Sequence, residues 1–133
     1  MSMPTQRALG RASNAGLLAA VAVVVLALSV ADADARRKPT EKERRAILRA
    51  VEQRGGCSAY PPGSCQMVVR VSTVRHGWAA AYIRARPGHE GTVRPDVASV
   101  RRKRGRWRVY QIGNGGGCGV PQAVRRDLRL RCL

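Results

Sequence analysis

The chain has few acidic residues, few aromatic residues and no phenylalanine. Its 133 residues contain 8 Asp and Glu against 25 Lys and Arg, a net charge of +17, and aromatic residues make up 4%. The shortage of carboxylates excludes an acidic binding surface. The short length excludes a large two-domain catalytic architecture and leaves room for one small domain. The hydrophobic fraction of 44% argues against disorder along the whole chain.

Signatures of enzymes are also missing. The sequence has no G-x-S-x-G, H-E-x-x-H or Walker-type run. The glycine-rich residues 113–119 (GNGGGCG) are not followed by Lys and Ser or Thr, so we interpret them as a flexible turn around a disulfide. We therefore expect no catalytic residues and no cofactor.

Lysine is scarce among the cations, since only Lys38, Lys42 and Lys103 stand beside the arginines. Arginine recognises phosphate and carboxylate groups through two hydrogen bonds at once. The codon bias of a GC-rich genome also favours arginine over lysine, and it accounts for the few aromatic residues as well. That bias does not explain why acidic residues are so few, so the net charge needs a reason of its own.

The first 35 residues have the three parts of a secretory signal peptide. Arg7 and Arg11 precede an apolar run over residues 16–30, and small residues then offer cleavage after Ala33 or Ala35. An uncleaved anchor is the alternative, but spanning a bilayer takes about 20 apolar residues and this run has 15. We expect an exported protein, secreted or held in the cell envelope, with residues 1–35 as signal peptide. Residues 36–133 then form one mature domain that keeps the whole net charge.

The mature part contains all four cysteines, which predicts two disulfides in a small exported chain. Four cysteines can form two disulfides in three ways. Local pairing is favoured because each pair brackets a loop rich in glycine and proline: Cys57 with Cys65, and Cys118 with Cys132. Neither pair has the spacing of a zinc site, so we expect no metal.

Two segments predict helices. Thr40 and Glu43 form a capping box that opens a helix, an apolar stripe runs along it, and Gly55 and Gly56 end it. Pro121 suits the first turn of a short C-terminal helix. Its apolar side consists of Val120, Val124 and Leu128.

The residues between the helices predict two β-hairpins. Residues 67–74 pair with 78–85, and residues 97–102 pair with 106–112. Alternation places Trp107 in the core beside Val109. The pattern predicts an α+β fold: an N-terminal helix packed on an antiparallel four-stranded sheet, a short C-terminal helix, and both helices on one face.

The segments V-R-V-S-T-V, W-A-A-A-Y and G-R-W-R-V-Y-Q-I-G, followed by C…V-P…V-R-R-D-L…C, resemble small exported α+β proteins of actinobacteria that have no assigned function. The resemblance covers nearly all of residues 40–133. It implies export and the fold above, and it brings no catalytic residues. The order of helix and sheet is also similar to cystatin-like and NTF2-like domains, a likeness of fold alone, from which function does not follow.

The densest charged motif is the predicted tip of the second hairpin, where six cations fall within eight residues: Arg101, Arg102, Lys103, Arg104, Arg106 and Arg108. A second basic stripe consists of Arg125, Arg126, Arg129 and Arg131. Such clusters bind nucleic acid, anionic envelope polymers or anionic lipid headgroups. The alternatives are a solvated turn that protects an edge strand, and the polar face of the short helix.

These observations favour an exported, non-enzymatic basic domain that binds anionic material in the envelope or outside the cell. One alternative is a secreted protein-binding module such as a peptidase inhibitor. It would use the loop over residues 60–63 (YPPG), which Cys57 and Cys65 hold. A less favoured alternative is a small ribonuclease. In it His76 and His89 would act as base and acid, and Arg or Lys would stabilise the phosphorane.

Overall fold

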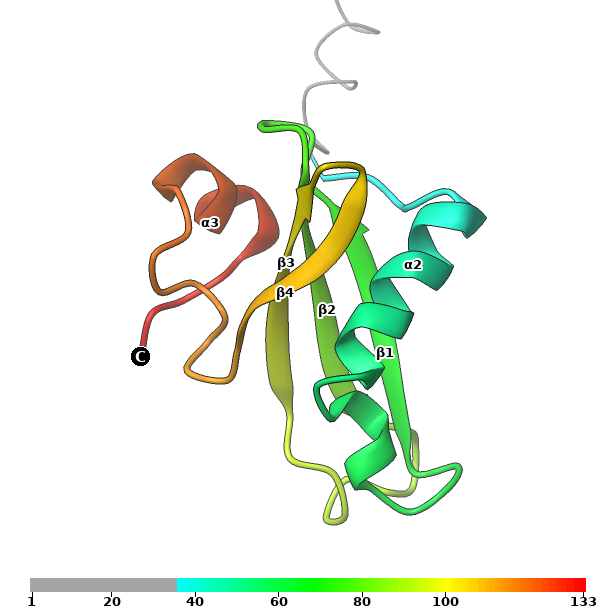
Figure 1. The fold of residues 1–133 in the computed structure, drawn as a ribbon. Helices are drawn as coiled ribbons and strands as arrows, with labels where there is room; N and C mark the ends of the chain where they lie inside the picture. The colour runs from blue at the N-terminus through cyan, green and yellow to red at the C-terminus, as the bar shows by residue number, and fades with distance from the viewer. Residues whose placement is uncertain (1–35) are drawn as a thin grey trace, which may run out of the picture. The chain divides into compact units, whose positions relative to one another are not determined.

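The computed structural model describes residues 36–133, so the expected signal peptide lies outside the described residues. Four strands form one antiparallel sheet in the order β1 (Cys65–Val71), β2 (Trp78–Ala85), β3 (Asp96–Lys103) and β4 (Arg106–Ile112). The helices are α2 (Glu41–Glu52), the 3-10 turn η1 (Gly56–Ala59) and α3 (Gln122–Leu128), as Figure 1 shows. The predicted α+β fold is confirmed.

Helix α2 begins with the predicted capping box. The Glu43 amide donates to Thr40 Oγ1 (3.2 Å) and the Thr40 amide donates to Glu43 Oε1 (2.9 Å). The Arg37 guanidinium adds two bonds of 2.8 Å to the same carboxylate. These bonds from Arg37 and Thr40 lower the pKa of Glu43 to about 2. Arg37 also exchanges backbone hydrogen bonds with Val71, so the chain before α2 covers part of the outer edge of β1.

Strand β1 lies earlier than expected, at 65–71 instead of 67–74. The next residue, Ser72, still donates its amide to the Trp78 carbonyl at 2.9 Å, and its hydroxyl donates to Asp127 Oδ2 at 2.7 Å. The Thr73 amide donates to the same oxygen at 3.2 Å. This contact with a residue 55 positions away along the chain outweighs the strand propensity of the Ser-Thr-Val run.

The two helices cover opposite faces of the sheet, which corrects the expectation of both on one face (Figure 1). Ile47 and Val51 of α2 pack with Ala79 and Ala81 of β2. The alternate residues of β2 face the other way and pack against the C-terminal segment: Trp78, Ala80 and Tyr82 lie with Val120, Val124, Leu128 and Leu130. Strand β2 is apolar at successive positions, and such a strand needs cover on both faces.

The predicted local disulfides are both present, Cys57–Cys65 and Cys118–Cys132. The glycine run beside the second one is closely packed, which corrects its interpretation as a flexible turn. The Gly117 amide donates to the Arg131 carbonyl at 2.8 Å, and the Arg131 amide donates to the Gly115 carbonyl at 3.1 Å. A Cβ atom at Gly117 would lie 2.7 Å from the Arg131 oxygen, so this position excludes a side chain.

Candidate anion-binding surface

The tip of the β3–β4 hairpin, which we call the tip cluster, consists of Arg101, Arg102, Lys103, Arg104, Arg106 and Arg108, and all six are exposed. Arg104 and Gly105 form the turn with positive φ values of 52° and 76°, as a tight two-residue hairpin turn requires. The register then places Arg101 opposite Arg108 and Lys103 opposite Arg106. Like charges directly opposite each other destabilise a strand pair. The paired cations therefore reduce the stability of this hairpin tip.

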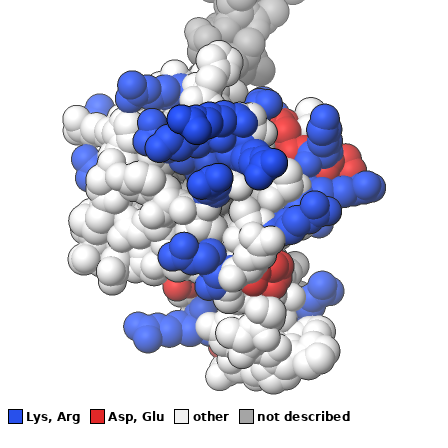
Figure 2. Space-filling model, in the orientation of Figure 1, with Lys and Arg blue, Asp and Glu red and all other residues white. Residues whose placement is uncertain are grey.

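No carboxylate of residues 36–133 lies within 4 Å of a tip cation. The ion pairs in this part of the chain join Glu41 and Glu43 to arginines in and before α2. The other acidic side chains bind hydroxyl or backbone N–H groups elsewhere: Glu52 at Ser58, Glu90 at Gly88, Asp96 at Val97 and Asp127 at Ser72 and Thr73. Figure 2 shows the Lys and Arg side chains gathered over this hairpin, with no Asp or Glu among them. The tip cluster is a concentration of uncompensated positive charge.

An aromatic pair lies beside the tip cluster on the α3 side of the sheet. The Trp78 and Tyr110 ring centroids are 5.1 Å apart at 76°, an edge-to-face arrangement. The Arg101 guanidinium carbon lies 5.5 Å from the Trp78 ring centroid. The Tyr110 hydroxyl donates to the Gly119 carbonyl at 3.2 Å. These contacts fix the position of both rings next to the cations.

The aromatic pair forms part of a hollow of about 280 Å³, which we call the aromatic hollow. The β1–β2 turn and the chain before α3 complete its walls. Its lining consists of Arg75, His76, Gly77, Trp78, Arg101, Arg102, Tyr110, Gly119 and Pro121. Tyr110 and Arg75 were not among the residues predicted for this surface. The position of Tyr110 could have been predicted, because side chains two residues apart in a strand point to the same face and Tyr110 lies two residues after Arg108.

The second basic stripe lies on the same side of the sheet, because α3 packs on Trp78 and Arg101 also contacts Trp78. Arg125, Arg126, Arg129 and Arg131 line a hollow of about 530 Å³ with Gln122 and Leu130. Arg125 Nε is buried and has no hydrogen-bond partner among the described residues. The second basic stripe and Arg101 of the tip cluster thus lie on one side of the sheet.

The two histidines of the ribonuclease hypothesis do not come together. His76 precedes β2 and His89 follows it, so the eight residues of β2 separate them (Figure 1). A strand rises about 3.3 Å per residue, which places the two turns about 25 Å apart. An acid and a base that act on one phosphodiester must both reach it within hydrogen-bond distance. The two-histidine mechanism lacks that geometry.

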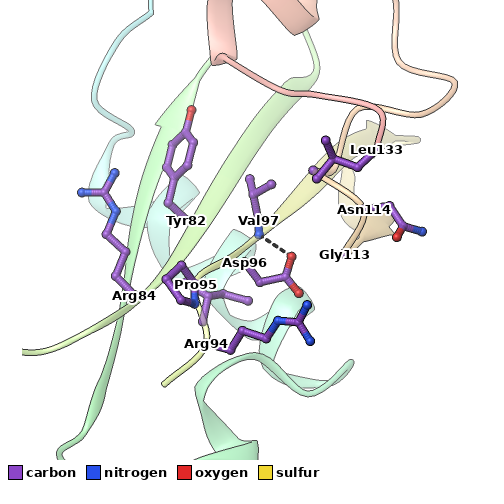
Figure 3. Close-up of a pocket in the computed structure, with 11 residues that line it drawn as sticks. Tyr82, Arg84, Arg94, Pro95, Asp96, Val97, Gly113, Asn114 and Leu133 are labelled. Atoms are coloured by element: carbon purple, nitrogen blue, oxygen red, sulfur yellow. Dashed lines mark hydrogen bonds between the residues drawn. The ribbon is translucent and has the colours of Figure 1, made fainter. Parts of the chain in front are cut away.

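A further hollow, of about 590 Å³, lies at the other end of the α3 side. Figure 3 shows Arg84 at the left and Arg94 at the bottom of it, with Tyr82 and Val97 toward the centre and Leu133 at the upper right. Asp96 accepts a hydrogen bond from the Val97 amide at 2.8 Å, and Arg84 lies 5.6 Å from the Tyr82 ring centroid. The charged groups of this hollow do not converge on a common point, so it offers no site for a single anion.

Among residues 36–133 no three His, Cys, Asp or Glu side chains gather as a metal site requires. Within the same residues no helix has the length and apolarity to cross a bilayer. Comparisons of the chain with protein-family models, with curated proteins and with solved structures each found no match.

Proposed function

We propose that residues 36–133 form an exported, non-enzymatic domain that binds a phosphate-bearing polymer through the tip cluster and the second basic stripe. The observation that supports it is the placement of Arg101 opposite Arg108 and Lys103 opposite Arg106, with no carboxylate of the described residues nearby. Opposed like charges are retained at a cost in stability. Proteins break local rules of this kind at functional sites.

Protection of an edge strand explains this charge less well. β4 is an edge strand, and charges on it would prevent pairing with another chain. Arg101, however, belongs to β3 and is paired on both sides, with Trp78 of β2 and Arg108 of β4. Its charge protects no edge. A bound polyanion would instead place phosphates between the opposed cations and remove their repulsion, and arginine binds phosphate through two hydrogen bonds.

The place of action in this proposal is the cell envelope or the space outside it. The two disulfides indicate an oxidising, extracytoplasmic compartment. The signal-peptide pattern of residues 1–35 and the resemblance to exported actinobacterial proteins support the same location. Polyanions of that compartment include envelope polymers and released nucleic acid.

The test compares two variants that each lose one lysine and two arginines. The tip variant carries Lys103→Gln, Arg104→Gln and Arg106→Gln, and the control carries Lys42→Gln, Arg49→Gln and Arg54→Gln on and just after α2. All six side chains are exposed. Fluorescence anisotropy with labelled inorganic polyphosphate should show about tenfold or greater weakening for the tip variant and little change for the control. Equal weakening in both would show that net charge alone attracts the polymer.

A second candidate function is that of a protein-binding module such as a peptidase inhibitor. Pro61, Pro62 and Gly63 are exposed in the loop that the Cys57–Cys65 disulfide closes. The Ser64 hydroxyl donates to the Pro61 carbonyl at 2.6 Å, so the loop is held in place from within. A rigid projection binds with little entropic cost. Assays against a panel of extracellular peptidases, before and after reduction, test it, and no inhibition in either state removes it.

A further inference from the structure

The aromatic hollow points to the chemical class of the polymer. Its volume of about 280 Å³ lies at the lower limit of the roughly 300–1,000 Å³ of pockets that bury a small molecule. It can accept one group of a longer chain that also contacts the neighbouring cations. What that group is depends on Tyr110, an exposed aromatic side chain of the hollow.

Tyr110 is the extra residue of a β-bulge. Val100 pairs with Val109 and Ser99 pairs with Gln111, so Tyr110 has no partner on β3. Bulges redirect side chains and are frequent beside functional sites. Here the Tyr110 ring lies against Trp78, and the Tyr110 hydroxyl donates to the Gly119 carbonyl. Even so, 44% of Tyr110 is exposed. An aromatic ring is thus held in place and open to solvent, in a chain with few aromatic residues.

Gly119 permits this arrangement. A Cβ atom at Gly119 would lie 2.6 Å from the Tyr110 hydroxyl oxygen, so a side chain there would displace the ring. The cations that line the hollow with this ring come from two parts of the chain: Arg75 from the β1–β2 turn, and Arg101 and Arg102 from the end of β3. Proteins bind single-stranded nucleic acid with fixed, exposed rings beside cations, on which the bases stack while the cations contact the phosphates.

We propose that the polymer is single-stranded nucleic acid and that Tyr110 stacks on one of its bases. This inference rests on the proposed polyanion binding and adds a contribution from the base. Bare polyphosphate has nothing to stack on Tyr110. A lipid surface would instead use exposed aliphatic side chains, of which Val74 in the β1–β2 turn is one.

The test measures the purified oxidised protein against two oligomers of about 12 units, one of thymidine nucleotides and one abasic with the same phosphates. Stacking on one base should make the thymidine oligomer bind about fivefold or more tightly. Tyr110→Leu should remove this difference and leave the affinity for the abasic oligomer unchanged, which also shows that the variant is folded. Tyr110→Phe keeps the ring and should keep the difference.

Each other outcome has a definite meaning. Equal affinity of the unmodified protein for the two oligomers overturns the inference and leaves polyanion binding in place. A base preference that survives in Tyr110→Leu overturns the role of Tyr110. Binding to anionic vesicles that Val74→Asn weakens, with no binding to either oligomer, overturns the inference in favour of a lipid surface. Absence of binding to both oligomers, to polyphosphate and to vesicles contradicts the proposed function itself.

Discussion

Replacing Arg108 by threonine should stabilise the protein, although it removes a side chain from the sheet. Arg108 lies opposite Arg101, and residues paired across two strands have Cα atoms about 4.5–5.5 Å apart. Removing one of two opposed like charges at this separation should raise the free energy of unfolding by about 0.5 kcal/mol. For a domain of this size the melting temperature should rise by about 2–4 °C.

Thermal unfolding followed by circular dichroism at low salt measures the effect, and salt identifies its cause. The gain should shrink in about 1 M salt, where the screening length falls to about 3 Å. The matched control is Arg84→Thr, because Arg84 is also exposed on a strand but lies opposite Gln66. Arg84→Thr should bring no gain. A loss of stability in Arg108→Thr at low salt, or a gain that salt leaves unchanged, would refute the argument that the tip charges repel.

Three further predictions concern what holds the fold together. Gly117→Ala should destabilise by about 1–3 kcal/mol in urea unfolding, because the new Cβ would lie 2.7 Å from a backbone oxygen; Gly91→Ala, with open space around it, should change little. Glu43→Gln should lower stability by about 1 kcal/mol at neutral pH. Because the pKa of Glu43 falls from 4.5 to about 2 on folding, the carboxylate stabilises the fold above pH 4.5. That contribution disappears as the pH falls through about 2, so unfolding curves of the two proteins should converge there. Replacing Cys118 and Cys132 by serine should cost about 3 kcal/mol, and equal stability with and without the disulfide would contradict its structural role.

Local patterns sufficed to predict most of the elements. Thr40 and Glu43 fix the start of α2 through side chains three residues apart, and the strand 78–85 has the predicted bounds. The local disulfide pairing also follows from features close in sequence. Each of these depends on interactions between residues near one another along the chain.

The features that escaped prediction depend on contacts between distant residues. The end of β1 is set by Asp127 of α3, and the close packing of the glycine run is set by Arg131. Strand β2 is apolar at successive positions, which is typical of a strand covered on both faces. This pattern could have predicted that the helices lie on opposite faces of the sheet. The candidate site follows the same division, since the tip cluster is contiguous in sequence. Arg75 lies beside it because the β1–β2 turn lines the same hollow, and Tyr110 because its ring contacts Trp78 of β2.

The salt dependence of binding tests the central claim most directly, that the tip cations contact the phosphates of a polymer. A plot of log affinity against log salt for the thymidine oligomer has a slope of about −0.7 per phosphate contact on a single strand. The variant Lys103→Gln, Arg104→Gln, Arg106→Gln should therefore have a slope shallower by about 2 than the unmodified protein. The charge-matched variant Lys42→Gln, Arg49→Gln, Arg54→Gln should keep the original slope. An unchanged slope in the tip variant, or the same change in both, would contradict the account.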